Sequence, residues 1–258
     1  MKKIQQLSII LLIIAALVFA CSDSDSNYSQ NADSGGGKGG SMARFAVHDD
    51  FLYVVDQNSL KTIDISTPET PKYLQGKEQY MGSGTETIFP KEDLLFIGSQ
   101  DGMYIYDIDD PKFPNLLSMT RHITSCDPVV ASGNYAYVTL NSENVWCGQR
   151  SNILQVYDIT DPKAPVIIKS ISLQSPRGLG VDGNKLFVCD IGLKVYDITS
   201  PENIKWIDDV TEISEISDKG TYDVIPIGGN LLVIGNDGFY QLNYEGEKLK
   251  YVSKILKD

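Results

Sequence analysis

The chain has little positive charge and few of the side chains that catalytic and metal centres use most. It has 22 Lys and Arg against 34 Asp and Glu, a net charge of -12, and only two histidines. Nucleic-acid binding relies on clustered Lys and Arg, so this balance excludes a nucleic-acid-binding protein. There is no nucleophile motif, no phosphate loop and no dinucleotide-binding glycine pattern, because "GLG" at 178–180 precedes no helical segment. The composition therefore predicts no cofactor.

The chain also lacks an apolar run long enough to span a bilayer. Its longest run covers residues 9–20, whereas a span needs roughly 20 residues. Lys2 and Lys3 precede this run, which predicts a signal peptide over 1–20. The sequence "LVFAC" that ends it resembles the bacterial lipobox, which would make Cys21 the lipidated first residue of the mature protein. Two or more acyl chains would anchor it stably. The alternative is an ordinary signal peptide followed by a chance cysteine.

Residues 21–41 contain almost nothing apolar and predict a flexible tether to a body of residues 42–258. The residue after Cys21 is Ser22, which indicates the outer membrane. Asp23 and Asp25 resemble the acidic signal that exports Bacteroidetes lipoproteins to the cell surface. We therefore expect an outer-membrane, surface-exposed protein. The periplasmic face is the alternative, with the acids belonging only to a solvated linker.

No segment of the body has a helical period, and a short phrase recurs instead. The copies are "LKTIDISTPETP" from Leu60, "MYIYDIDDPKFP" from Met103, "LQVYDITDPKAP" from Leu154, "LKVYDITSPENI" from Leu193 and a degenerate "FYQLNYEGEKL" from Phe239. A β-branched and aromatic run such as "FLYVVD" or "KLFVCD" precedes each copy. We read four strands per repeat, named a to d, with strand b in the preceding run and strand c in the phrase.

Four antiparallel strands every 40 to 50 residues is the blade period of a β-propeller. The body has room for five such blades. The prediction is an all-β, five-bladed β-propeller of four-stranded antiparallel blades, in which each blade covers its neighbour. The aspartates of the phrase are Asp64, Asp107, Asp158 and Asp197, and we expect them to accept hydrogen bonds in the turn that the following proline begins.

These phrases resemble the LVIVD-repeat proteins of Bacteroidetes and related bacteria. The resemblance covers nearly the whole body and rests on "LYVVD…LKTIDISTPETP", "LFIGSQDGMYIYDIDDPKFP" and "LFVCDIGLKVYDITSPEN". It implies a propeller in the cell envelope and no established activity. The fifth repeat departs from the pattern, since "NYEGEKL" replaces the Asp-Pro turn.

The irregular connections lie between strands d and a and between strands b and c, which share one face of a propeller. The longest is residues 141–152 in blade 3, and the connection before that blade is residues 120–128. Cys126 and Cys147 can meet there, and an oxidising envelope favours a disulfide between them. A metal site of His122, Cys126 and Cys147 is the weaker alternative, because zinc prefers closely spaced pairs and four ligands. Cys189 is expected to be a small buried residue.

The starts of the five channel strands bring charged side chains to one end of the channel. Two successive ring positions read Ala43, Glu86, Asp127, Arg177, Tyr222 and Arg44, Thr87, Pro128, Gly178, Asp223. One hypothesis is a carbohydrate-active hydrolase or lyase using Glu86, Asp127 and Asp223, because two carboxylates suffice for glycoside hydrolysis. The other is a polar channel in which Arg44 and Arg177 keep these acids ionised.

We favour a non-catalytic, lipid-anchored scaffold that binds a protein or a glycan through this face. No metal is expected. The predicted binding residues are Arg44, Arg121, His122, Trp146, Arg150 and Arg177.

Overall fold

A computed structural model describes residues 40–76, 78–82, 84–121, 128–141, 152–216 and 220–257. The chain divides into two units, Met1–Asp33 and Ser34–Asp258, and the described residues belong to the second. No helix among them is long and apolar enough to cross a membrane.

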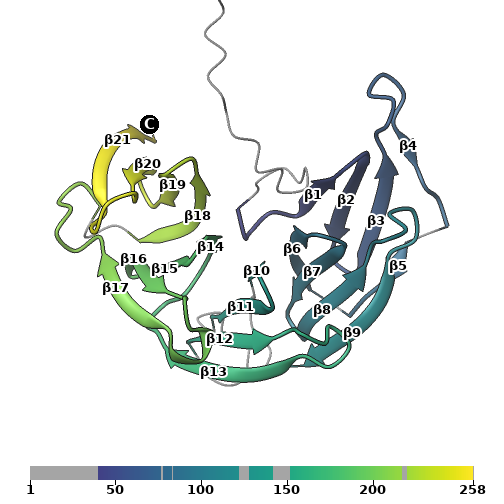
Figure 1. The fold of residues 1–258 in the computed structure, drawn as a ribbon. Helices are drawn as coiled ribbons and strands as arrows, with labels where there is room; N and C mark the ends of the chain where they lie inside the picture. The colour runs from purple at the N-terminus through teal and green to yellow at the C-terminus, as the bar shows by residue number, and fades with distance from the viewer. Residues whose placement is uncertain are drawn as a thin grey trace, which may run out of the picture. The chain divides into compact units, whose positions relative to one another are not determined.

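The described unit consists of five antiparallel sheets that follow one another in chain order (Figure 1). This confirms the predicted five-bladed propeller. Blades 1 and 2 contain β1 (Phe45–His48), β2 (Phe51–Asp56), β3 (Ser59–Asp64), β4 (Lys72–Tyr73), β5 (Gln79–Tyr80), β6 (Thr85–Lys91), β7 (Leu94–Ser99), β8 (Gly102–Asp107) and β9 (Asn115–Arg121). Blades 3 to 5 contain β10 (Val129–Ser132), β11 (Tyr135–Leu140), β12 (Ile153–Asp158), β13 (Val166–Ser172), β14 (Leu179–Asp182), β15 (Lys185–Asp190), β16 (Gly192–Asp197), β17 (Lys205–Asp209), β18 (Thr221–Ile227), β19 (Asn230–Gly235), β20 (Gly238–Asn243) and β21 (Lys250–Leu256).

The outer edge is the one place where the blades differ in strand number. Blades 2 to 5 each have one outer strand, whereas two short strands, β4 and β5, both pair with β3 in blade 1. A single-turn 3₁₀ helix, Pro201–Asn203, precedes the outer strand of blade 4.

The tight turns between strands a and b need a residue in the left-handed backbone region. Gly133 and Gly183 fill this position in blades 3 and 4 with φ of 54° and 53°. Asp49 and Glu92 adopt φ of 49° and 50° in blades 1 and 2. Glycine takes this conformation without a Cβ penalty, so the two acidic residues are the less favourable solutions of the same turn.

The aspartates of the repeated phrase have the structural role predicted for them. The backbone amides of Ser66, Thr160 and Thr199 each donate to the aspartate two residues earlier, at 2.8 to 3.0 Å. Asp107 accepts in the same way from Asp109 at 2.9 Å. In blade 5 the Asn243 side chain takes this place and accepts from the Glu245 amide at 3.3 Å. These are Asx turns that end strand c.

The apolar core lies between neighbouring blades and not at the centre of the ring. Four clusters of buried residues join blades 1 and 2, 2 and 3, 3 and 4, and 4 and 5. The third residue of strand b is a large side chain in each of the first four blades and is fully buried there: Tyr53, Phe96, Tyr137 and Phe187. Such close-packed contacts supply most of the hydrophobic stabilisation of a repeat fold.

The junction between blades 5 and 1 is built differently. Within the described ranges, no apolar cluster spans it, since β18 packs against β14 and β15 while β1 packs against β6. Residues 40–42, which we call the N-terminal strap, bridge it with hydrogen bonds. Ser41 Oγ donates to Asp223 Oδ1 at 3.1 Å and accepts from the Leu179 amide at 2.7 Å. The ring therefore has four packed junctions and one strapped junction.

Candidate functional site

The channel mouth is formed by the starts of the inner strands, and its register matches the ring read from the sequence. The residue that pairs with the fifth position of strand b is Thr87 in blade 2 and Asp223 in blade 5. Backbone bonds place Arg44, Pro128 and Gly178 at the same level, opposite Val55, Thr139 and Cys189. The five residues therefore occupy equivalent positions around one end of the channel.

Asp223 is a buried acid at this mouth. Both carboxylate oxygens are engaged: Oδ1 accepts from Ser41 Oγ at 3.1 Å and from the Val224 amide at 3.0 Å, and Oδ2 accepts from the Met42 amide at 3.4 Å. Burial raises the pKa of this carboxyl, and the three donors only partly offset the effect. Gly40 approaches so closely that a Cβ there would lie 1.9 Å from Asp223 Oδ2. Asp223 is therefore enclosed by the strap.

Glu86 and Arg177 are half-buried, and each contacts a neighbouring side chain. Glu86 occupies the bulge at the start of β6 and accepts a hydrogen bond from Gln100 Nε2 at 3.0 Å. The Arg177 guanidinium lies over the Tyr222 ring, 4.5 Å from its centroid. This cation–π contact holds the guanidinium at the junction of blades 4 and 5.

The chain has four arginines, and the three that the structure describes lie on this face. Arg44 precedes β1, Arg121 ends β9, and Arg177 lies between β13 and β14. Arg150 lies outside the described residues, in the segment between β11 and β12. Arg44 and Arg121 are exposed. The three described guanidinium groups are therefore concentrated on one face of an acidic chain, whereas its lysines also lie on other parts of the molecule.

Several predicted residues have no structural account. Cys21, His122, Cys126, Asp127, Trp146 and Cys147 all lie outside the described residues, as does Arg150. The disulfide and the third carboxylate therefore stay predictions. Cys189 is a free cysteine and is fully buried in β15, as expected, and burial raises the pKa of its thiol.

Sequence reasoning missed two polar residues that shape the mouth. Ser41 was assigned to the tether but is buried between the starts of β14 and β18. Asp190, at the end of β15, is also buried. It accepts from the amides of Gln174 and Ser175 and pairs with Lys194 at 2.7 Å. Its one sequence signal is the aspartate that ends "KLFVCD", which matches Asp56 at the end of "FLYVVD".

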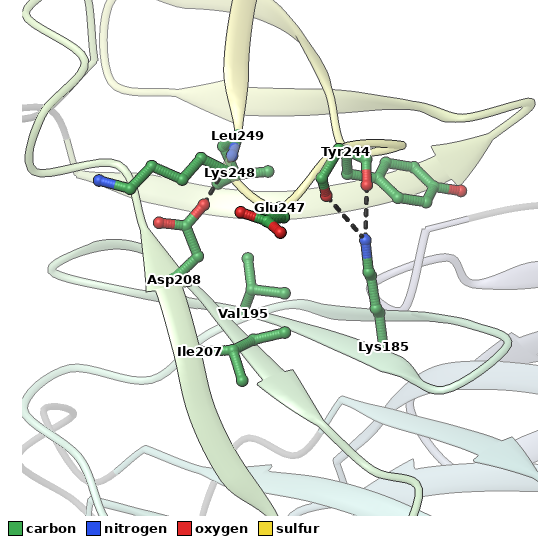
Figure 2. A pocket seen from close by; sticks show the side chains of 9 residues that line it. Lys185, Val195, Ile207, Asp208, Tyr244, Glu247, Lys248 and Leu249 are labelled. Carbon is green, nitrogen blue, oxygen red and sulfur yellow. Dashed lines mark hydrogen bonds between the residues drawn. The ribbon is translucent and has the colours of Figure 1, made fainter.

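A small hollow on the opposite face is lined by residues that hold the irregular turn of blade 5 in place (Figure 2). Lys185 Nζ donates to the Tyr244 carbonyl at 2.6 Å, and Asp208 Oδ2 accepts from the Leu249 amide at 2.6 Å. Tyr244 also donates to Asp182 Oδ2 at 2.6 Å. Polar contacts with blade 4 thus replace the missing Asp-Pro turn. Nowhere in the described ranges do three His, Cys, Asp or Glu residues gather as metal ligands.

Comparison with known proteins supports the repeat and the fold. Residues 39–75 and 125–172 match the LVIVD repeat family model. No curated protein matches the chain. Three similar solved structures are a functionally unknown protein from Desulfotomaculum acetoxidans DSM 771, BamB from Moraxella catarrhalis and AztD from Citrobacter koseri.

The likeness to these structures is one of fold. The TM-scores are 0.66, 0.52 and 0.58, with 14%, 14% and 13% identity over 83%, 83% and 81% of this chain. The matched parts cover 69%, 64% and 60% of those chains, so this chain spans about two thirds of their length. Together with the repeat match, they identify the described unit as a five-bladed propeller that contains LVIVD repeats.

Proposed function

We propose that this chain is a non-catalytic binding scaffold of the cell envelope, anchored through lipid on Cys21. Its partner is a protein or glycan that carries carboxylate or sulfate groups, and it binds the face that bears Arg44, Arg121 and Arg177. The observation that carries this proposal is the placement of the three described guanidinium groups, those of Arg44, Arg121 and Arg177, on one face of an acidic chain. Guanidinium groups bind such anions through paired N–H donors, which lysine cannot reproduce.

The alternative, a carbohydrate-active hydrolase or lyase, has less support. Asp223 is enclosed by the strap and uses both oxygens on structural donors. A general acid must reach the leaving oxygen of the substrate, and the strap lies in that path. Glu86 is held by Gln100. The raised pKa of Asp223 follows from its burial and needs no catalytic explanation.

Binding is tested with the full chain and two polysaccharide probes, anionic polygalacturonate and neutral dextran. We expect binding to polygalacturonate only, falling with added salt because exposed charges are screened. Arg44→Gln with Arg121→Gln should lower affinity about tenfold, which is the effect of losing roughly 1.4 kcal/mol. The matched control is Lys112→Gln with Lys163→Gln, which removes two exposed lysines from the Asp-Pro turns of the opposite face.

Equal loss in both double variants would show that only net charge matters and would contradict a specific face. Release of reducing ends from any polysaccharide, abolished by Asp223→Asn without loss of fold, would establish the hydrolase instead. Binding to neither probe would direct the search to protein partners by cross-linking in intact cells.

Anchoring and orientation are tested separately. Cys21→Ser should release the protein from the membrane fraction, because the acyl chains attach to that thiol. Protease treatment of intact cells should remove the body if it lies on the surface. Protection until the cells are lysed would place it on the periplasmic face.

A further inference from the structure

The strapped junction leaves one apolar sheet face uncovered on each side. The strand registers place Ile225, Leu232, Ile234, Phe239 and Ile255 on the side of blade 5 that faces away from blade 4; we call this the blade 5 free face. Leu232 is 42% exposed, Phe239 56% and Ile255 73%. Single exposed apolar residues are ordinary, but a continuous set on one sheet face indicates an interaction surface.

Blade 1 carries the matching half. Its free face consists of Phe45, Val47, Leu52, Val54 and Ile63, which the registers place on the side away from blade 2. Phe45 is 63% exposed, and the other four are half-buried. Leu52 and Val54 occupy the repeat positions of Leu95 and Ile97, which are fully buried against the preceding blade.

The two free faces are therefore the two halves of an interface that the chain forms four times internally. Leu232 occupies the position of Phe96, which is buried against the following blade. The two segments of chain that bear these faces also differ in charge. Residues 250–257 contain Lys250, Lys254 and Lys257 and no acid, whereas residues 45–80 contain six acids and three lysines. Such complementarity steers association and fixes register.

Within one molecule these halves are held apart. The strap contacts β18, where Gly40 and Ser41 lie against Asp223. At the packed junctions the inner strands meet directly instead, as where the Gly178 amide donates to the Tyr222 carbonyl and the Ile88 amide to the Ala43 carbonyl. The same chain therefore contains a surface that complements the blade 5 free face, namely the blade 1 free face, but the two do not pack against each other within one molecule.

We propose that the blade 5 free face binds the blade 1 free face of a second copy of this chain. The contact is heterologous, because two different surfaces meet, and it continues the blade-on-blade packing across two molecules. Leu232 and Phe239 are its apolar centre.

The test is co-purification of two full-length copies that carry different tags and are expressed together. After extraction in excess detergent, pulling on one tag should recover the other. Leu232→Asp with Phe239→Asp in both copies should lower recovery about tenfold or more, since charges are strongly disfavoured at an apolar interface centre. The control, Trp206→Asp with Ile207→Asp, alters two exposed apolar residues of β17 and should leave recovery unchanged.

A second variant guards against misfolding: Val54→Asp alters only the blade 1 free face and should lower recovery in the same way. Absence of co-purification for the unaltered chain at every concentration tested would overturn the proposal. So would co-purification that survives both the blade 5 and the blade 1 variants, because another surface would then join the copies.

Discussion

The packed junction between blades 4 and 5 and the strapped junction between blades 5 and 1 use the same repeat in opposite ways. In the first, Phe187 is fully buried, and its ring lies 4.8 Å from that of Tyr244. In the second, Leu232 at the equivalent position is nearly half exposed, and the connection is made by Ser41 and Asp223. Side chains of one repeat position thus differ in energetic role because of the neighbour each one meets.

Two adjacent leucines in β19 give the strongest test of that difference. Leu231 is fully buried against blade 4, and Leu232 lies on the blade 5 free face. Leu231→Ala should lower the free energy of unfolding by about 2–5 kcal/mol, through lost burial and the cavity left behind. Leu232→Ala should cost less than about 1 kcal/mol in dilute protein. Chemical denaturation at low concentration measures both.

Equal costs would contradict the comparison, because they would mean that Leu232 is buried within a single molecule. A cost for Leu232→Ala that rises with protein concentration would instead support association through that face.

The strap itself is tested through pH. The pKa of Asp223 is raised in the folded protein, so its stabilising contribution is present below the ordinary carboxyl range and is lost as pH rises through the raised value. Asp223→Asn keeps an acceptor for Ser41 and Val224 but has no charge to bury. The variant should therefore gain stability relative to the unaltered chain over the pH range from the ordinary carboxyl pKa upward. Denaturation midpoints across that range measure the gain, and a constant difference would contradict a buried, ionising carboxylate.

The smallest effect is expected at the Asx turns, which occur in all five blades. The Thr199 hydroxyl and amide lower the pKa of Asp197, so its contribution is present at neutral pH and is lost as pH falls through the lowered value. Asp197→Asn should remove this acid dependence and change neutral stability little, because the site is exposed. The same change at Asp158 serves as the matched comparison.

The blades were predictable from sequence because their signals are local and repeated. Runs such as "FLYVVD" and "KLFVCD" became β2 and β15 with the predicted bounds, and the phrase aspartates ended the third strand of each of the first four blades. Each signal needs only its own neighbours in the chain, so tertiary context had little to override.

The strapped junction was not predictable in this way. Gly40 and Ser41 end a segment of low complexity, and nothing local indicates that Ser41 is buried against Asp223, 182 residues away. Leu232 and Phe239 have the residue types of an interior blade, so their exposure depends on how the ring ends meet. The register of the channel mouth could be read from the repeats. Whether its acids are enclosed could not be predicted, because the enclosing residues, Gly40 and Ser41, are distant in the sequence from Asp223.

The strap also determines how the propeller responds to mechanical load. A pull on the chain ahead of Gly40 reaches Asp223 and Leu179 before it reaches β1, because Ser41 is bonded to both. Force is thereby shared among blades 1, 4 and 5, and β1 is not the first strand to be peeled from its sheet. A body held by a tether in moving fluid would strain this serine and this buried carboxylate first.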